Sequence, residues 1–233
     1  MEKKEYDGLV ADFHAHTRYS SCGRDDPEAL VLEMIRCGVN VLGITDHHYG
    51  IGDRKREYFR LLTDLKEKYK DRITLYRGIE IATVDWLELD RSEDISYFDY
   101  CLVEHIDRAD SVVGSDVTGY IGSLNLKAGI AHTDLFGYVR DRGLDPFSFF
   151  GDLKKKGIFW EMNVSYDSTH QYREHEYVKE FFRNTDQQKL IRDVGLQISV
   201  GFDGHKMEDY RVDRVRDACR FLSENGFNLL TGF

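Results

Sequence analysis

The segment GLVADFHAH, residues 8–16, is an apolar run that ends in polar side chains. The run Gly8–Phe13 is typical of a buried β-strand. Successive residues of a strand face opposite sides, so we expect His14 and His16 to point the same way and to reach one metal ion together. The segment therefore predicts a strand that delivers two imidazole ligands at its carboxyl end.

Similar apolar runs recur along the chain and alternate with helical patterns. The further predicted strands are Val39–Thr45, Ile73–Ile81, Phe98–Val103, Ala128–Ala131, Ile158–Asn163 and Leu196–Gly201. Asp26-Pro27 and Asp145-Pro146 predict helix starts, because an Asp cap followed by Pro suits the first helical turn. Glycines at 38 and 157 predict the ends of these two helices. Repeated strand–helix units indicate a parallel sheet, either doubly wound or closed into a barrel.

Polar, metal-capable residues stand at the end of every predicted strand. After the first strand, they are Asp46, His47 and His48; Glu80; Glu104 and His105; His132 and Asp134; Glu161 and Asn163; and Asp203 and His205. In a β/α barrel the carboxyl ends of all strands meet at one rim, where active sites lie. A polar set that is spread over seven strands favours a barrel over a doubly wound sheet.

Length and composition restrict the remaining possibilities. The chain has 233 residues, 41% of them hydrophobic, which predicts one domain spanning residues 1–233. The net charge of −10 disfavours a nucleic-acid partner. No apolar run approaches the ~18 residues of a membrane span, and the four cysteines form no paired motif. We expect a cytoplasmic protein with reduced thiols, and the pattern leaves the oligomeric state open.

The strand-end residues include more ligands than one metal ion uses. The eight candidates are His14, His16, His47, Glu80, His105, His132, Asp203 and His205. A catalytic metal usually takes about three protein ligands, so the set predicts two to three divalent transition metal ions, Zn, Mn or Fe. Such a cluster suits hydrolysis of a phosphate ester by a metal-activated hydroxide.

The motifs DFHAHTRYS, GITDHH, GIEIA and GFDGH, with the His105 and His132 strand ends, resemble the PHP (polymerase and histidinol phosphatase) family in order and spacing. The resemblance extends from residue 12 to residue 205 and is strongest to the stand-alone, histidinol-phosphatase-like branch. It implies an α/β fold, a distorted (β/α)7 TIM-like barrel with a trinuclear metal site at the carboxyl ends of the strands.

The resemblance also implies a role for each ligand. His14, His16, Glu80 and Asp203 would hold one metal; Glu80, His105 and His132 a second; and His47 and His205 the third. Glu80 would bridge two metals, and Asp46 would orient a ligand. Asp46, Glu80 and His205 are accordingly the predicted catalytic residues.

The loop after the first strand departs from the family pattern. It reads SSCG, and Cys22 stands where many members have a histidine or an aspartate. Cys22 is either a thiolate ligand or an ordinary loop cysteine beside a weaker third site. Glu161, Asn163 and His48 are expected near the site without a ligand role. His170 and His175 are expected at the surface, with His170 a candidate for the pocket mouth.

The resemblance makes histidinol phosphate a plausible substrate, and nucleotide, sugar and other small phosphoesters are equally open. A phosphate monoester such as histidinol phosphate would need cations besides the metals, and Arg18, Arg24 and Arg54 lie in predicted rim loops. One alternative is a metal hydrolase of the TatD or amidohydrolase kind, or an exonuclease acting on nucleic-acid ends. Those barrels also open with HxH but lack the TDH of GITDHH. Another alternative is a non-catalytic metal-binding module.

Overall fold

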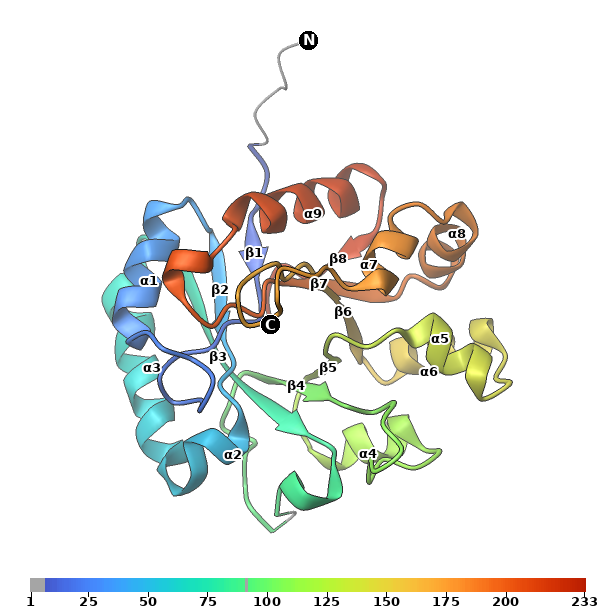
Figure 1. Cartoon of the computed structure of the whole chain (residues 1–233), viewed down its shortest axis with the longest axis horizontal. Coiled ribbons are helices and arrows are strands. Elements are labelled where there is room, and N and C mark those ends of the chain that lie inside the picture. Colours follow the sequence, from blue (N-terminus) through green and yellow to red (C-terminus); the bar gives the residue numbers. More distant parts are fainter. Residues whose placement is uncertain (1–6, 91) are drawn as a thin grey trace.

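The predicted strands are present and form one parallel sheet in chain order. In the computed structural model, which describes residues 7–90 and 92–233, an eight-stranded sheet runs from β1 to β8. The strands are β1 (Ala11–Asp12), β2 (Val41–Ile44), β3 (Thr74–Ala82), β4 (Tyr100–Glu104), β5 (Ala128–Ile130), β6 (Phe159–Asn163), β7 (Gln197–Gly201) and β8 (Asn228–Leu229). Every neighbouring pair is parallel. The sheet curls, and its strands fan out around a common centre (Figure 1).

The curled sheet closes on itself at the carboxyl ends of its strands. Just beyond β1 and β7, Phe13 N–H donates to the carbonyl of Val200 at 2.9 Å and His16 N–H to that of Gly204 at 2.9 Å. Ala15 and Gly204 form a parallel bridge between these segments. The short β8, which was not predicted, pairs with the beginning of β7 instead. The predicted distorted (β/α)7 barrel is therefore confirmed, with one small additional strand.

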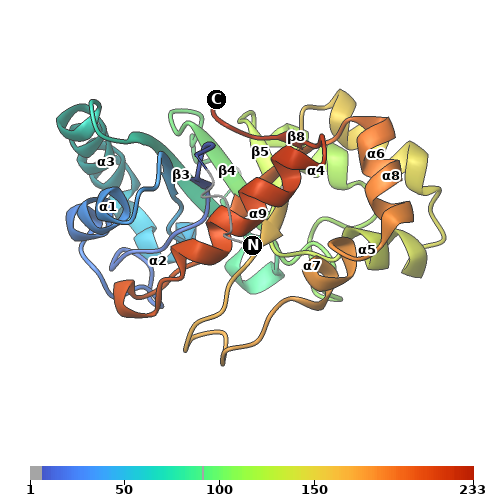
Figure 2. The ribbon, with the colours of Figure 1, turned by 90° about the horizontal axis from the view of Figure 1, so that it is seen from above.

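Helices follow most strands and cover the outside of the sheet. They are α1 (Pro27–Arg36), α2 (His48–Ile51), α3 (Lys55–Tyr69), α4 (Val117–Ser123), α5 (Leu135–Asp141), α6 (Pro146–Lys155), α7 (Glu176–Phe181), α8 (Thr185–Val194) and α9 (Val212–Glu224). Seen from above, α1 and α3 flank one side, α5 to α8 the other, and α9 crosses between them (Figure 2). This outer layer buries the apolar face of each helix against the sheet.

Local sequence signals explain where several helices begin and end. The Asp26 side chain accepts from Glu28 N–H before α1, and Asp145 accepts from Ser148 N–H before α6. Both helices end before a glycine with positive φ, 77° at Gly38 and 68° at Gly157. These predicted caps are confirmed. Before α8, the side chain of Asn184 accepts from the N–H groups of Asp186 and Gln187.

Aromatic side chains fill the barrel interior below the rim. Phe13, Tyr100 and Phe159 belong to an interior cluster and are fully buried. The ring of Phe233 lies 4.6 Å from that of Tyr100 and 5.5 Å from that of Phe13, so the end of the chain contacts this cluster. The Tyr100 hydroxyl donates to the carbonyl of Phe13 at 2.5 Å. Gly43 leaves room for that hydroxyl, because a Cβ there would lie 1.9 Å from the Tyr100 oxygen.

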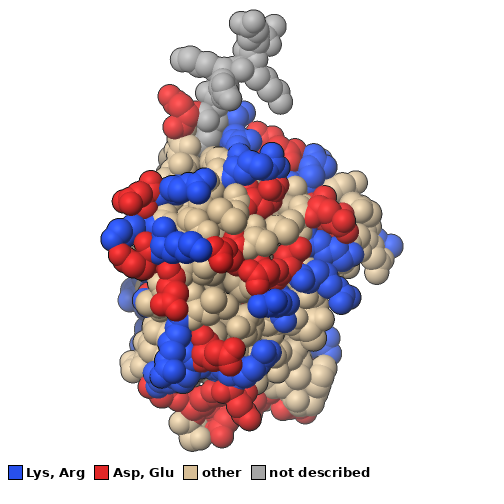
Figure 3. All heavy atoms as spheres, turned by 90° about the vertical axis from the view of Figure 1, so that its left-hand side faces the viewer, with Lys and Arg blue, Asp and Glu red and all other residues tan. Residues whose placement is uncertain are grey.

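The outer surface carries no single-sign field on the face formed by α1 to α3. Lysines and arginines alternate there with aspartates and glutamates (Figure 3). Several of these charges pair, as Lys68 does with Glu28 and Arg36 with Glu33. Within residues 7–90 and 92–233, no helix has the length and apolarity to cross a membrane.

We predict that Gly43→Ala destabilises the protein by about 1–3 kcal/mol, because the added methyl group overpacks the barrel against Tyr100. Adding Tyr100→Phe should recover part of this loss, since it removes the nearest atom. Gly122→Ala on α4 is the matched control, because a Cβ there meets nothing within 4 Å. Denaturant unfolding measures all variants. Equal stability of the Gly43 and Gly122 variants would contradict the packing described.

Candidate metal centre

The strand ends bring the predicted ligands together at one rim. His14 and His16 follow β1, His47 follows β2, and Glu80 lies within β3. The remaining candidates, His105, His132, Asp203 and His205, follow β4, β5 and β7. All of them except His105 belong to groups whose ligand atoms lie within 4.8 Å of one another.

Glu80 lies at the centre of the cluster and is fully buried. Its Oε1 lies 3.2 Å from His14 Nε2 and 3.2 Å from His132 Nε2. Its Oε2 lies 3.3 Å from His16 Nε2 and 2.8 Å from His47 Nδ1. Each oxygen thus faces a different pair of imidazoles, which is the position that a carboxylate bridging two metals requires.

Asp203 closes the side of the cluster next to the first strand. Its Oδ1 lies 3.0 Å from His16 Nε2 and 3.5 Å from His14 Nε2. The two Nε2 atoms lie 3.1 Å apart, so the HxH pair points to one place as predicted. His14, His16 and Asp203 form one group able to hold a metal.

Glu104 belongs to a second metal-capable group, although it is not among the eight predicted ligands. Its carboxylate lies 3.0 Å from His105 Nε2, 3.3 Å from His47 Nδ1 and 3.7 Å from His132 Nε2. The metal-capable group there is Glu80, Glu104 and His132. His105 contacts Glu104 and lines the site, but the structure does not place it in that group.

Three of the predicted ligands have strained backbones. His105, His132 and Asp203 adopt positive φ angles of 66°, 23° and 58°. L-residues avoid this region, and such strain is found mostly where function requires a particular side-chain direction. Here the turn at the end of each strand directs an additional polar side chain into the rim.

A buried carboxylate and a buried amide contact two of the ligands and help to hold them in place. Glu161 Oε1 lies 2.7 Å from His14 Nδ1, which turns the Nε2 of this ring toward the cluster. Gly201 allows this contact, because a Cβ there would lie 2.0 Å from Glu161 Oε1. Asn163 Nδ2 donates to Asp203 Oδ2 at 3.3 Å. Glu161 and Asn163 thus support ligands, in agreement with their expected place beside the site.

Asp46 is buried and organises the loop after β1. It accepts from Thr17 N–H at 2.7 Å and from Ser20 N–H at 3.0 Å. Ser20 Oγ in turn lies 3.2 Å from His16 Nδ1 and accepts from His47 N–H at 2.8 Å. Asp46 therefore acts on the ligands through this loop, and its catalytic role stays a prediction.

The expectation that His175 lies at the surface is wrong, whereas His170 lines the pocket as its alternative placement proposed. Both are partly buried and line the pocket, because the segment after β6 returns across the rim. His170 Nδ1 lies 2.7 Å from Asp167 Oδ1, and its Nε2 lies 3.1 Å from Asp203 Oδ2. Asp167, His170 and His205 form a further metal-capable group. The sequence feature that indicates this position is the polar run after β6, which is a strand that ends at the rim.

The ligands open into a pocket of about 270 Å³. Its lining residues are His47, Glu80, Glu104, His105, His132, Thr169, His170, His175, Asp203 and His205. Imidazoles and carboxylates make up nearly all of this wall, and within the described part of the chain no Lys or Arg belongs to it.

The predicted phosphate-binding arginines lie outside this pocket. Arg18 pairs with Asp26 at 2.9 Å, and the Arg54 guanidinium lies 4.9 Å from the ring centre of Tyr19. Arg24 is exposed, and its backbone N–H donates to the carbonyl of His205 at 3.0 Å. Their contact with substrate stays a prediction.

The charges at the centre compensate one another. Burial would lower the pKa of His14, but the carboxylates of Glu80, Asp203 and Glu161 raise it well above its usual value. Burial would raise the pKa of Glu80, but the imidazoles of His14 and His47 hold it well below its ordinary range. A site that favours ionised carboxylates and positive charge in a buried place is suited to cations.

Several buried polar atoms at the site make no well-aligned hydrogen bond within the described structure, although His47 Nδ1 and Glu80 Oε2 lie 2.8 Å apart. These atoms are His47 Nδ1, Glu80 Oε2, Glu104 Oε1 and His205 Nδ1. Orphaned buried polar atoms are costly, and cations coordinated here would satisfy them together. The mixed imidazole and carboxylate donors suit Zn, Mn or Fe. The residues present therefore fit two to three divalent metal ions.

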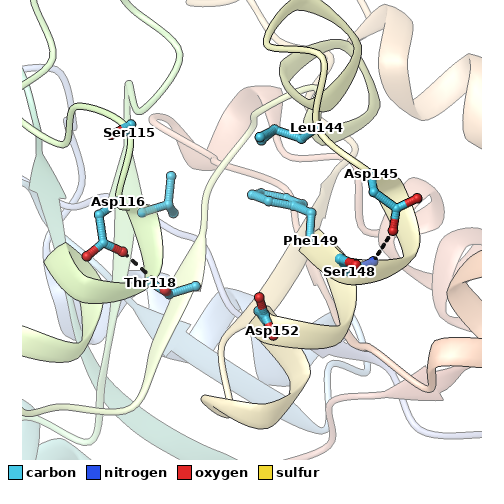
Figure 4. A pocket seen from close by; sticks show the side chains of 9 residues that line it. Ser115, Asp116, Thr118, Leu144, Asp145, Ser148, Phe149 and Asp152 are labelled. Carbon is cyan, nitrogen blue, oxygen red and sulfur yellow. Dashed lines mark hydrogen bonds between the residues drawn. The ribbon is translucent and has the colours of Figure 1, made fainter.

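A second pocket, of about 220 Å³, lies between α4 and α6 (Figure 4). It contains Asp116, Asp145 and Asp152 and no histidine. Asp116 and Asp145 already accept backbone N–H groups as helix caps. This pocket is therefore a junction of helix starts and lacks the donors of the rim site.

Comparison with known proteins is consistent with this geometry. The PHP domain family matches residues 12–205. No curated protein sequence matches the chain. A histidinol phosphate phosphatase from Lactococcus lactis subsp. lactis Il1403, solved with zinc, L-histidinol and phosphate, has a TM-score of 0.66 at 18% identity, over 97% of each chain. A proposed histidinol phosphatase from Listeria monocytogenes has a TM-score of 0.55 at 14% identity, over 85% of this chain and 96% of that one. At these identities the likeness shows the shared fold.

We predict that Glu161→Gln lowers the affinity for metal by about 10–100-fold, because His14 loses the carboxylate that orients its ring. Competition with a chelator measures the affinity, and circular dichroism checks that the variant folds. Glu176→Gln is the matched control, since that exposed carboxylate pairs with Lys179 on α7. Unchanged metal affinity in folded Glu161→Gln protein would exclude the supporting role of Glu161.

Proposed function

Because the chain belongs to the PHP domain family and is a metal-dependent phosphoesterase, we propose that it hydrolyses small phosphate monoesters, with histidinol phosphate as the first candidate. The observation that carries the proposal is the position of Glu80. Its two carboxylate oxygens lie between two different pairs of imidazoles. Closely spaced metals held by one bridging carboxylate are suited to in-line displacement at phosphorus.

The size and charge of the site favour a small substrate. A pocket of about 270 Å³ accommodates a small molecule rather than a polymer chain. The net charge of −10 also disfavours binding along a nucleic acid. The Lactococcus neighbour contains L-histidinol and phosphate, which supports histidinol phosphate or a related small phosphoester as the substrate.

The residues of the chain have separable tasks in the proposed reaction. Bound divalent metals supply positive charge for the phosphoryl oxygens and acidify the attacking water. Glu80, Asp203 and the imidazoles around them fix where that charge lies. His170, held by Asp167 at 2.7 Å, presents its Nε2 to the pocket. We place His170 and His175 against the substrate, where they position the phosphoryl group or the leaving oxygen.

We predict that Glu80→Gln lowers kcat/KM for histidinol phosphate by at least about a hundredfold and reduces the metal bound at saturation, because the amide is uncharged and keeps only one oxygen that can coordinate a metal. Steady-state kinetics and metal analysis on the same samples measure the two effects. Glu67→Gln is the control, since that exposed side chain pairs with Lys70 on the surface of α3.

The substrate panel distinguishes the proposed reaction from its alternatives. It should contain histidinol phosphate, a nitrophenyl phosphate monoester, a phosphodiester, single-stranded DNA and an amide. Turnover of the monoesters alone supports the proposal. Turnover of DNA ends or of the amide alone would contradict it. Tight metal binding without turnover of any member would indicate a non-catalytic metal-binding module.

A further inference from the structure

Cys22 faces the rim site from the loop after β1. Its sulfur, together with nitrogen atoms of His16 and His205, forms a group whose ligand atoms lie within 4.8 Å of one another. Cys22 is partly buried, so the group combines a reachable sulfur with buried imidazoles.

The loop that carries Cys22 is held rigidly in this position. Asp46 accepts two backbone N–H groups from it, those of Thr17 and Ser20. Arg24 N–H donates to the carbonyl of His205 at 3.0 Å, which ties the loop to the end of β7. Gly23 permits the turn, because a Cβ there would lie 2.1 Å from the carbonyl oxygen of Thr17. Together these contacts fix the position of the Cys22 sulfur beside the imidazoles.

Two carboxylates flank the imidazole of His205. Its Nδ1 lies 3.8 Å from Asp167 Oδ2, and its Nε2 lies 3.8 Å from Asp203 Oδ1 on the pocket side. Asp167 is buried, and its other oxygen lies 2.7 Å from His170 Nδ1. His205 Nδ1 itself has no hydrogen-bond partner among the described residues, so a bound cation would satisfy an otherwise unpaired ring.

The other three cysteines have different surroundings. Cys101 and Cys219 are buried in the apolar core, and burial raises the pKa of both thiols. Cys37 donates to Glu33 on α1 at 3.4 Å. Of the four, only Cys22 appears in a metal-capable group within the described residues. Cys37 is thus a suitable control for any experiment on Cys22.

We propose that the group of His16, Cys22 and His205 holds a third metal ion, with the Cys22 sulfur as a direct thiolate ligand. The proposal rests on the proposed function only in taking the rim as a metal centre. A thiolate is a soft donor, whereas the other ligands of the rim are imidazoles and carboxylates. The third site should therefore prefer Zn²⁺ or Co²⁺ over Mn²⁺, while the two sites that share Glu80 should accept all of these ions.

Cobalt spectroscopy on the full chain tests the proposal directly. Co²⁺ bound to a thiolate gives a sulfur-to-metal charge-transfer band in the near ultraviolet, which nitrogen and oxygen ligands do not give. We expect this band in the wild-type protein and in Cys37→Ser, and its loss in Cys22→Ser. The weakest-bound Zn²⁺ equivalent of Cys22→Ser should also lose at least about tenfold in affinity.

Cys22→His keeps the test decisive even if Cys22→Ser folds poorly. This variant retains a ligand atom, so we expect the full metal content without the charge-transfer band. Absence of the band in wild-type protein that binds Co²⁺ would overturn the proposal, whatever its phosphatase activity. Presence of the band without turnover of any phosphoester would leave the thiolate site intact and contradict the proposed function instead.

Discussion

The burial of the Glu80 carboxylate is the constraint on which the rest of the site depends. A fully buried charge is very costly unless opposite charges and hydrogen bonds surround it. Here imidazoles of His14, His16, His47 and His132 approach its two oxygens. Protonated imidazoles, or metal cations bound between them, supply the positive charge that this carboxylate needs. The barrel makes this possible, because it brings four separate strand ends to one buried point.

Other buried carboxylates then specify where those imidazoles lie. Glu161 holds the ring of His14, while Asp167 lies behind the ring of His205. Asp46 acts indirectly, since it holds the loop that contacts His16 and carries Cys22. These three acids are themselves buried. They convert a set of flexible side chains into a preorganised site, whose ligands lie close enough to bind cations without large rearrangement.

Much of this arrangement could be predicted because parallel strands impose a simple rule. Their carboxyl ends share one rim, so polar residues at those ends had to meet there. Glu104 was not predicted as a ligand, because Glu104 and the adjacent His105 should face opposite sides of a strand. The positive φ of 66° at His105 ends that alternation, and both side chains reach the rim. His175 was misplaced and His170 was given only an alternative place at the pocket, because an irregular segment has no periodicity from which its path can be predicted.

The central claim is that this rim is a multinuclear metal centre. Its most direct test is the metal content of the purified wild-type protein, measured by inductively coupled plasma mass spectrometry before and after reconstitution with Zn²⁺, Mn²⁺ or Fe²⁺. The account predicts two to three tightly held equivalents per chain. Failure to retain any metal after reconstitution, in protein shown to be folded, would contradict the account at its base.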